Sequence, residues 1–400
     1  MAGGKYLQQK PPKKGGRQAV TNTRSADNGE VRRMPNNTGK NSGGKKVLLI
    51  VLIAILVLII GVAIAGIIYY NSVLSMMSRP EDVTVPTLSE EEINELLGLN
   101  VTEAEEVTEG TTSPLETWPE VISDKNITNI MLVGQAARMG EEHRLADSNI
   151  LVSINRETKT VTLTSILRDL RVNIPAYEGH GAGFNRINVV YHLGSFYTGE
   201  KIDSMKMMEM CIENNFGVKV DYTIEIDFDL FTTIVDLFGG MMLTLTQEEI
   251  DYMQLYYWAH EPIAELVEGD NWVDGFTALC YARMRKVGNG DWDRTSRQRE
   301  VITNLFERAK NNNIITLNNC LKYVMPMITT DMSNEDITNL AFEILPMLKD
   351  LKIQSQTIPF EGTWWGTDLD PDGVHNYVID ANLWNNGLKL RESIGYETEE

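Results

Sequence analysis

Residues 47–70 form an uncharged stretch of twenty-four positions that ends in the pair Tyr69 and Tyr70. As a helix this stretch would be about 36 Å long, enough to cross a hydrocarbon core of about 30 Å. Lys45 and Lys46 stand directly before it. A cleavable signal peptide is the alternative, because Ala63-Ile64-Ala65 resembles a cleavage site, but the apolar region of a signal peptide runs only about 7 to 15 residues. The sequence therefore predicts one retained transmembrane helix.

Charge is distributed very unevenly on the two sides of this stretch. Residues 1–46 hold eleven Lys and Arg against Asp27 and Glu30, a net charge of +9, so the remainder of a chain that carries −20 must carry −29. The positive-inside rule places the tail in the cytoplasm and the acidic bulk outside, in a cell-membrane protein. We expect residues 1–46 to be disordered and to lie near anionic membrane lipid. Because the acidic bulk would repel a phosphate backbone, no nucleic acid partner is expected.

Residues 71–125 combine four prolines with many glutamates, which is typical of a solvated extracellular stalk. Within it we expect only a short helix over 89–97, with Ser89 as N-cap and Glu92 completing a capping box.

From residue 126 onward, apolar patterns of strand length and helix length alternate. Strands are expected over 129–134, 149–154, 161–165, 222–226, 241–245 and 352–358, and helices over 205–216, 230–238, 317–328 and 333–349. This alternation predicts an α/β fold with a mixed central sheet flanked by helices. The odd set of Cys211, Cys280 and Cys320 is interpreted as small buried hydrophobes.

Positive charge gathers again between residues 281 and 299, where six cationic side chains occupy nineteen positions. If a helix begins near Asp293 or Thr295, its inward face carries the apolar residues Val301, Ile302, Leu305 and Phe306 together with Arg294, Arg297 and Gln298. A buried arginine needs an anionic partner, and its planar fork fits phosphate oxygens. A phosphate or pyrophosphate pocket is one interpretation, and a structural network of arginines and carboxylates is the other.

Several ordered landmarks resemble the LytR-CpsA-Psr family of envelope proteins, whose members are also described as cell-envelope-related transcriptional attenuators. The resemblance runs from about 129 to 310. Its landmarks are the segments 129–134, 144–147, 165–169, 185–188, 234–240, 274–275, 281–285 and 291–298. It implies a family-type domain over 126–312, behind one transmembrane helix, and leaves 313–400 as a C-terminal extension without an assigned role.

The resemblance also implies a function and a site. Family members are understood to move a glycopolymer such as teichoic acid from undecaprenyl pyrophosphate to a peptidoglycan hydroxyl, in Gram-positive envelopes. The positions implied to surround the pyrophosphate are Arg144, Arg168, Arg283, Arg285, Arg294 and Gln298. Those implied for catalysis are Arg283, Arg285, Asp147 and Asp169.

One departure from the family pattern concerns magnesium. Members commonly place an aspartate two residues after the glycine of the first strand, where it helps to hold Mg²⁺, and here Ala136 follows Gly134 and Gln135. Asp147 and Asp291 remain as possible Mg²⁺ ligands. Two hypotheses therefore stay open: a transferase, and a non-catalytic envelope regulator that binds polyprenyl phosphate. Trp364 and Trp365 are candidates for stacking on sugar rings or for ordinary surface packing.

Overall fold

The computed structural model describes residues 68–85, 120–135, 145–257, 265–312, 314–369 and 376–396, together with residues 66, 87 and 89. The predicted tail, most of the predicted membrane helix, and the predicted helix over 89–97 apart from its cap residue lie outside the described residues. Among the described residues, no helix combines the length and the apolar character needed to span a bilayer.

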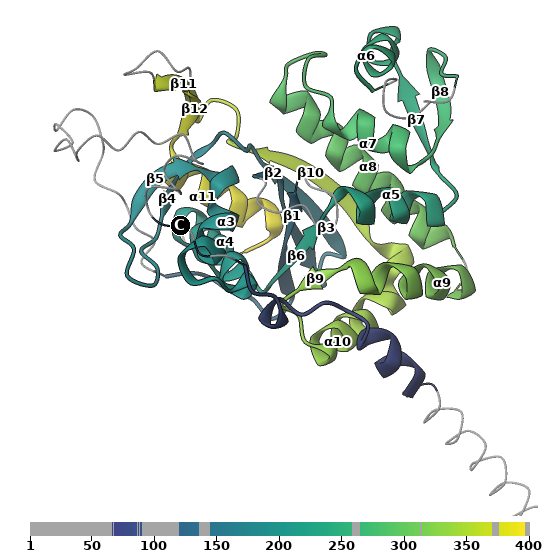
Figure 1. The fold of residues 1–400 in the computed structure, drawn as a ribbon, viewed down its shortest axis with the longest axis horizontal. Helices are drawn as coiled ribbons and strands as arrows, with labels where there is room; N and C mark the ends of the chain where they lie inside the picture. Colours follow the sequence, from purple (N-terminus) through teal and green to yellow (C-terminus); the bar gives the residue numbers. More distant parts are fainter. Residues whose placement is uncertain are drawn as a thin grey trace, which may run out of the picture. The chain divides into compact units, whose positions relative to one another are not determined.

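A six-stranded mixed sheet organises the described part of the chain, in the order β10-β3-β2-β1-β6-β9 (Figure 1). Its strands are β1 (Ile127–Gln135), β2 (Ala146–Asn155), β3 (Thr160–Ile166), β6 (Tyr222–Ile226), β9 (Thr329–Thr330) and β10 (Lys352–Ile358). β1 pairs antiparallel with β2 and parallel with β6, while β3 pairs antiparallel with β2 and parallel with β10. The predicted mixed sheet is confirmed, and β2 and β3 form an antiparallel hairpin within it.

Helices cover both faces of this sheet because its strands are apolar on both sides. On β1, Met131 and Val133 face one core, whereas Ile130 and Leu132 face another. The first core is closed by α3 (Ile187–Thr198), α4 (Lys201–Phe216) and α11 (Leu383–Ile394). The second is closed by α8 (Asp291–Asn311), α10 (Asn334–Ile344) and the 3-10 helix Leu345–Asp350. Figure 1 shows α3, α4 and α11 on one side of the sheet and α8 on the other.

A third core lies beside the sheet and shares α8 with it. It contains α5 (Phe228–Leu237), β7 (Met241–Leu245), α6 (Gln247–Tyr257), β8 (Gly269–Val273) and α7 (Gly275–Arg283). The predicted apolar stripe of α8 divides between the two cores: Val301 and Leu305 face the third core, and Ile302 and Phe306 face the sheet. This double packing fixes α8, and α8 carries much of the candidate site.

The remaining elements lie around these cores. They are β4 (Arg171–Ile174), β5 (Gly183–Arg186), α9 (Ile314–Val324), β11 (Trp364–Leu369), β12 (Asn376–Ala381) and the 3-10 helices Pro80–Asp82 and Met325–Met327. β11 and β12 form an antiparallel hairpin.

Two predicted domain boundaries differ from the structure. Residues 71–85, predicted as the start of a solvated stalk, pack onto the domain because Val73, Leu74 and Met77 form an apolar stripe against Met325. Residues beyond 312 are no separate extension, since β9 and β10 are strands of the central sheet and α11 closes its first core. The polar surface of β10 hid its place at the edge of the sheet.

Gly194 marks the closest approach of α3 to α4. A Cβ at this position would lie 1.9 Å from the backbone oxygen of Asp203. Gly194→Ala is therefore expected to lower the free energy of unfolding by about 3 kcal/mol, which outweighs the helix-propensity gain of about 1 kcal/mol. Thermal unfolding against Gly181→Ala, where a Cβ meets no atom within 4 Å, measures this effect. Equal midpoints for the two variants would contradict it.

Candidate functional site

Arg294 anchors the site from the first turn of α8. Its side chain is buried, with the residue only 1% exposed, and its Nη2 lies 2.7 Å from Asp291 Oδ1. The same nitrogen donates to the backbone oxygen of Asp147 at 2.9 Å. Burial lowers the pKa of Arg294 to about 10, although Asp291 opposes this shift. Its Nε and Nη1 are buried and have no hydrogen-bond partner among the described residues. Because unpaired buried donors are costly, these two nitrogens are available to bind an anion in the cavity that Arg294 lines.

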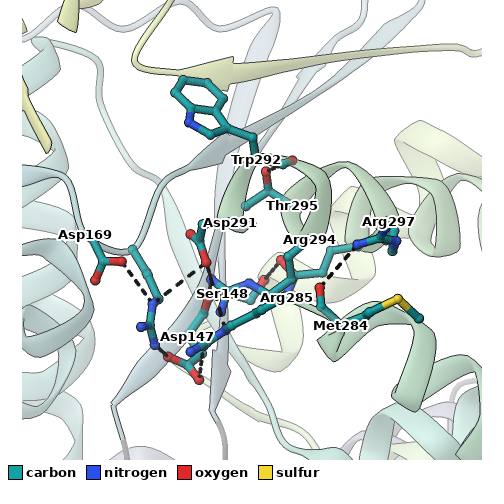
Figure 2. A network of polar contacts seen from close by, with 12 residues as sticks. Asp147, Ser148, Asp169, Met284, Arg285, Asp291, Trp292, Arg294, Thr295 and Arg297 are labelled. Carbon is teal, nitrogen blue, oxygen red and sulfur yellow. Dashed lines mark hydrogen bonds and ion pairs between the residues drawn. The ribbon is translucent and has the colours of Figure 1, made fainter. Parts of the chain in front are cut away.

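Asp147 links two arginines of the network (Figure 2). The register of β1 and β2 shifts between Gly134 and Gln135, which leaves Asp147 as the extra residue of a β-bulge. Its Oδ1 accepts a hydrogen bond from Arg168 Nη1 at 2.7 Å, and its Oδ2 accepts one from Arg285 Nη2 at 2.8 Å. Burial alone would raise the pKa of Asp147, but the two arginines outweigh burial and lower it. Asp147 thus stays ionised and holds both guanidinium groups in place.

Asp169 and Asp291 complete the network. Arg168 Nε lies 3.3 Å from Asp169 Oδ2 and 3.8 Å from Asp291 Oδ1, and Arg186 Nη1 lies 3.8 Å from Asp169 Oδ1. Burial raises the pKa of Asp291, although Arg294 and Arg168 counteract it. Asp291 Oδ2 and Asp169 Oδ1 are buried without a hydrogen-bond partner in the described part of the chain. The network thus contains more cations than anions. Its four arginines are Arg168, Arg186, Arg285 and Arg294, and its three carboxylates are Asp147, Asp169 and Asp291.

A cavity of about 310 Å³ opens beside this network. Its polar lining includes Asp147, Ser148, Asp227, Arg283, Arg285, Arg294 and Gln298. Its apolar lining includes Leu132, Ile150, Ile226, Phe228, Phe231, Leu279, Ala282 and Ile302. A single bound molecule can therefore contact both arginines and hydrocarbon side chains.

Arg283 and Gln298 are held by contacts of different kinds. The Arg283 guanidinium lies over the ring of Phe228, 4.2 Å from its centroid, so this cation faces the apolar part of the lining. Gln298 Oε1 accepts a hydrogen bond from Ser148 Oγ at 3.0 Å, which ties α8 to β2 at the wall of the cavity.

Arg297 belongs to a structural ion pair and does not line the cavity. Its Nε donates to Glu249 Oε1 at 2.9 Å, and its Nη1 and Nη2 donate to the backbone oxygens of Met284 and Val287. The structural interpretation is thus confirmed for Arg297. Arg294 faces the cavity, where the interpretation as a phosphate or pyrophosphate pocket stays a prediction.

The structure brings most of the predicted site together. Arg283, Arg285, Arg294, Gln298 and Asp147 line one cavity, and Arg168, Asp169 and Asp291 join them through ion pairs. Arg144 and Ala136 lie outside the described residues. The apolar lining of the cavity includes Phe231 of α5 and Ile302 of α8, whereas Met205, Met207 and Met208 of α4 lie in the first core.

Sequence reasoning missed three residues of the site. Arg186 was quoted only as part of a landmark, yet it faces Asp169. Phe228 and Phe231 line the cavity, and their i, i+3 spacing at the start of a helix was the signal that placed them on one face.

The fit of a divalent cation rests on Asp291 and Asp147. The described residues contain no group of three or more His, Cys, Asp or Glu side chains arranged to hold a metal. Mg²⁺ is commonly held by one or two carboxylates together with phosphate oxygens, however. The buried Asp291 Oδ2, which has no hydrogen-bond partner among the described residues, suits such a shared site. The neighbouring Asp147 could be a second ligand, although Arg168 and Arg285 already contact its two oxygens.

The fold and site together define an α/β protein with an arginine-lined cavity that has an apolar wall. Residues 95–386 match the LytR_cpsA_psr family model, a longer span than the landmarks indicated. The chain belongs to the LytR-CpsA-Psr family.

Curated relatives agree with this membership, and a solved structure shares the fold. The chain is 26% identical over 288 residues to biofilm regulatory protein A of Streptococcus mutans, covering 69% of this chain and 66%, just under two thirds, of that protein. It is 28% identical over 269 residues to the polyisoprenyl-teichoic acid–peptidoglycan teichoic acid transferase TagU of Bacillus licheniformis. This match covers 66% of this chain and 78% of that protein. A structure of TagT bound to LIIa-WTA shares the fold, with a TM-score of 0.51 and 24% identity over 68% of this chain and 90% of that one.

Proposed function

We propose that the chain is a membrane-anchored phosphotransferase that moves an anionic glycopolymer from a polyprenyl pyrophosphate carrier to peptidoglycan. One observation carries this proposal: a single cavity is lined by Arg283, Arg285 and Arg294 and by a set of apolar side chains. Arginines suit the pyrophosphate, and the apolar lining suits the prenyl chain. The names of TagT and TagU as teichoic acid transferases support the same activity.

The proposed reaction is a phosphoryl transfer. An acceptor hydroxyl oxygen attacks the phosphorus attached to the glycopolymer, the bond from that phosphorus to the bridging oxygen breaks, and polyprenyl phosphate leaves with the electron pair. The hydroxyl proton passes to Asp169, whose Oδ1 has no hydrogen-bond partner among the described residues. Arg168, Arg285 and Arg294 stabilise the charge on the phosphoryl oxygens, and Asp147 keeps the first two in place.

Asp147 and Asp291 would hold Mg²⁺ together with pyrophosphate oxygens. When bound, the ion supplies further neutralisation of the phosphoryl charge.

The test uses the full-length protein in detergent, a pyrophosphate-linked oligosaccharide donor, and wall fragments as acceptor. We expect polyprenyl phosphate to be released only when acceptor is present, and to fall when Mg²⁺ is chelated. Tight donor binding without release under any divalent cation would overturn the assignment as an enzyme.

The second candidate is a regulator that binds polyprenyl phosphate without turnover. It is favoured by Asp147, because both of its carboxylate oxygens are already engaged by arginines. A donor that binds tightly and is never consumed in the same assay would establish this function instead.

A further inference from the structure

Two indole rings meet at the edge of the arginine network. Trp292 follows Asp291 directly at the start of α8, as Figure 2 shows. Its ring centroid lies 5.3 Å from that of Trp364 on β11, with 39° between the ring planes. Trp292 is partly buried against the first core, whereas Trp364 is 37% exposed. The pair thus forms an aromatic surface in which Trp292 packs against the core and Trp364 is accessible to solvent.

The hairpin that carries Trp364 is hydrogen-bonded to the segment that contains Asp169. β12 lies next to β4 (Figure 1), and Ile379 N donates to the backbone oxygen of Asp169 at 2.9 Å. Arg171 Nη1 of β4 lies 3.4 Å from Asp380 Oδ1 of β12, and this ion pair is a second contact that holds β12 in place. The position of Trp364 is therefore coupled to that of Asp169 and Arg168, although the hairpin lies far from them in sequence.

The chemistry of this aromatic surface suits a sugar. A pyranose ring has an apolar face of C–H groups that stacks on indole, while its hydroxyl groups seek polar neighbours. Polar groups of the adjoining network are near in the chain, because Asp291, which pairs with Arg168, directly precedes Trp292, and the hairpin of Trp364 is hydrogen-bonded to the backbone of Asp169. Prenyl hydrocarbon would instead favour the cavity, whose apolar lining includes Phe228 and Phe231.

We propose that Trp292 and Trp364 form a sugar-binding subsite for the pyranose ring nearest the reacting phosphorus. This inference rests on the proposed function, since that function requires a sugar on the donor phosphate and another on the acceptor. The sugar of the donor and the sugar of the acceptor both have the required chemistry, and the two arms of the test distinguish between them.

Trp364→Ala in the full-length protein is the direct test, because Trp364 is the more exposed member of the pair. One arm measures binding of chitotetraose, a soluble N-acetylglucosamine oligomer that represents the acceptor strand. The other compares a polyprenyl pyrophosphate that carries a disaccharide with the same carrier lacking sugar. We expect the variant to weaken chitotetraose or the sugar-bearing donor about tenfold and to leave the sugar-free carrier unchanged.

Trp272→Ala is the matched control. Trp272 is 53% exposed, but it lies on β8, donates to the Gly239 backbone oxygen and contacts Arg308. Trp272→Ala should leave the affinities for chitotetraose and for the sugar-bearing donor unchanged. Trp364→Phe should regain part of the affinity that Trp364→Ala loses.

The outcomes separate this inference from the proposed function. A loss confined to chitotetraose assigns the subsite to the acceptor, and a loss confined to the sugar-bearing donor assigns it to the donor. Either loss supports the subsite even if no transfer occurs. Unchanged affinity for both sugar ligands in Trp364→Ala overturns the subsite, even in a protein that transfers normally.

Discussion

Arg285→Ala is expected to reduce kcat/KM for glycopolymer transfer by roughly 100- to 1,000-fold, the usual loss when one donor to a developing oxyanion is removed. Arg285 lines the cavity, and its Nη2 lies 2.8 Å from Asp147 Oδ2. The substitution removes a cation that faces the pyrophosphate and also leaves Asp147 Oδ2 without its arginine partner, so that Arg168 alone pairs with this carboxylate. Release of polyprenyl phosphate from the lipid-linked donor measures the effect.

Controls for this prediction come from the same segment. Lys286→Ala removes the neighbouring cation, which lies over the Tyr256 ring rather than in the cavity, and should leave transfer unchanged. Arg285→Lys keeps the charge but loses the planar fork, so an intermediate rate is expected. If Arg285→Ala transferred within about twofold of the unaltered protein, the role of the arginine in stabilising the phosphoryl oxygens would be rejected.

Local patterns were sufficient to predict the central elements of the fold. β6 and β7 have the predicted bounds, because each is a short apolar run between turn residues. The place of β10 beside β3 was not accessible from the sequence, since it depends on a parallel pairing between residues almost two hundred positions apart. No local pattern encodes such a pairing.

The candidate site was likewise predictable where local patterns determine it and not where it depends on contacts between distant residues. The helical period placed Arg294 and Arg297 on the buried face of α8, and both are buried. It did not reveal that Glu249 would neutralise one of them while the other would face a cavity, because Glu249 lies on a distant helix. The resemblance named Asp147 as a site residue, but only the strand register showed that it lies in a bulge.

The final prediction concerns Arg297, which supports the site without lining it. Arg297 and Glu249 are both buried and paired at 2.9 Å. Arg297→Met leaves the Glu249 carboxylate buried and unpaired, which should lower stability by about 3–5 kcal/mol and the thermal midpoint by roughly 5–15 °C. Thermal unfolding followed by circular dichroism measures this shift.

The double variant Arg297→Met with Glu249→Gln separates stability from function. It removes both charges and keeps a side-chain oxygen for the Thr246 amide, so much of the lost stability should return. We expect Arg297→Met to impair transfer as well, and the double variant should not restore it. In both variants the backbone oxygens of Met284 and Val287, on either side of Arg285, lack the donors that Arg297 supplied. Full recovery of transfer together with stability would show that Arg297 serves only to neutralise Glu249. Recovery of stability alone would show that a buried guanidinium holds the Arg285 segment in its active position.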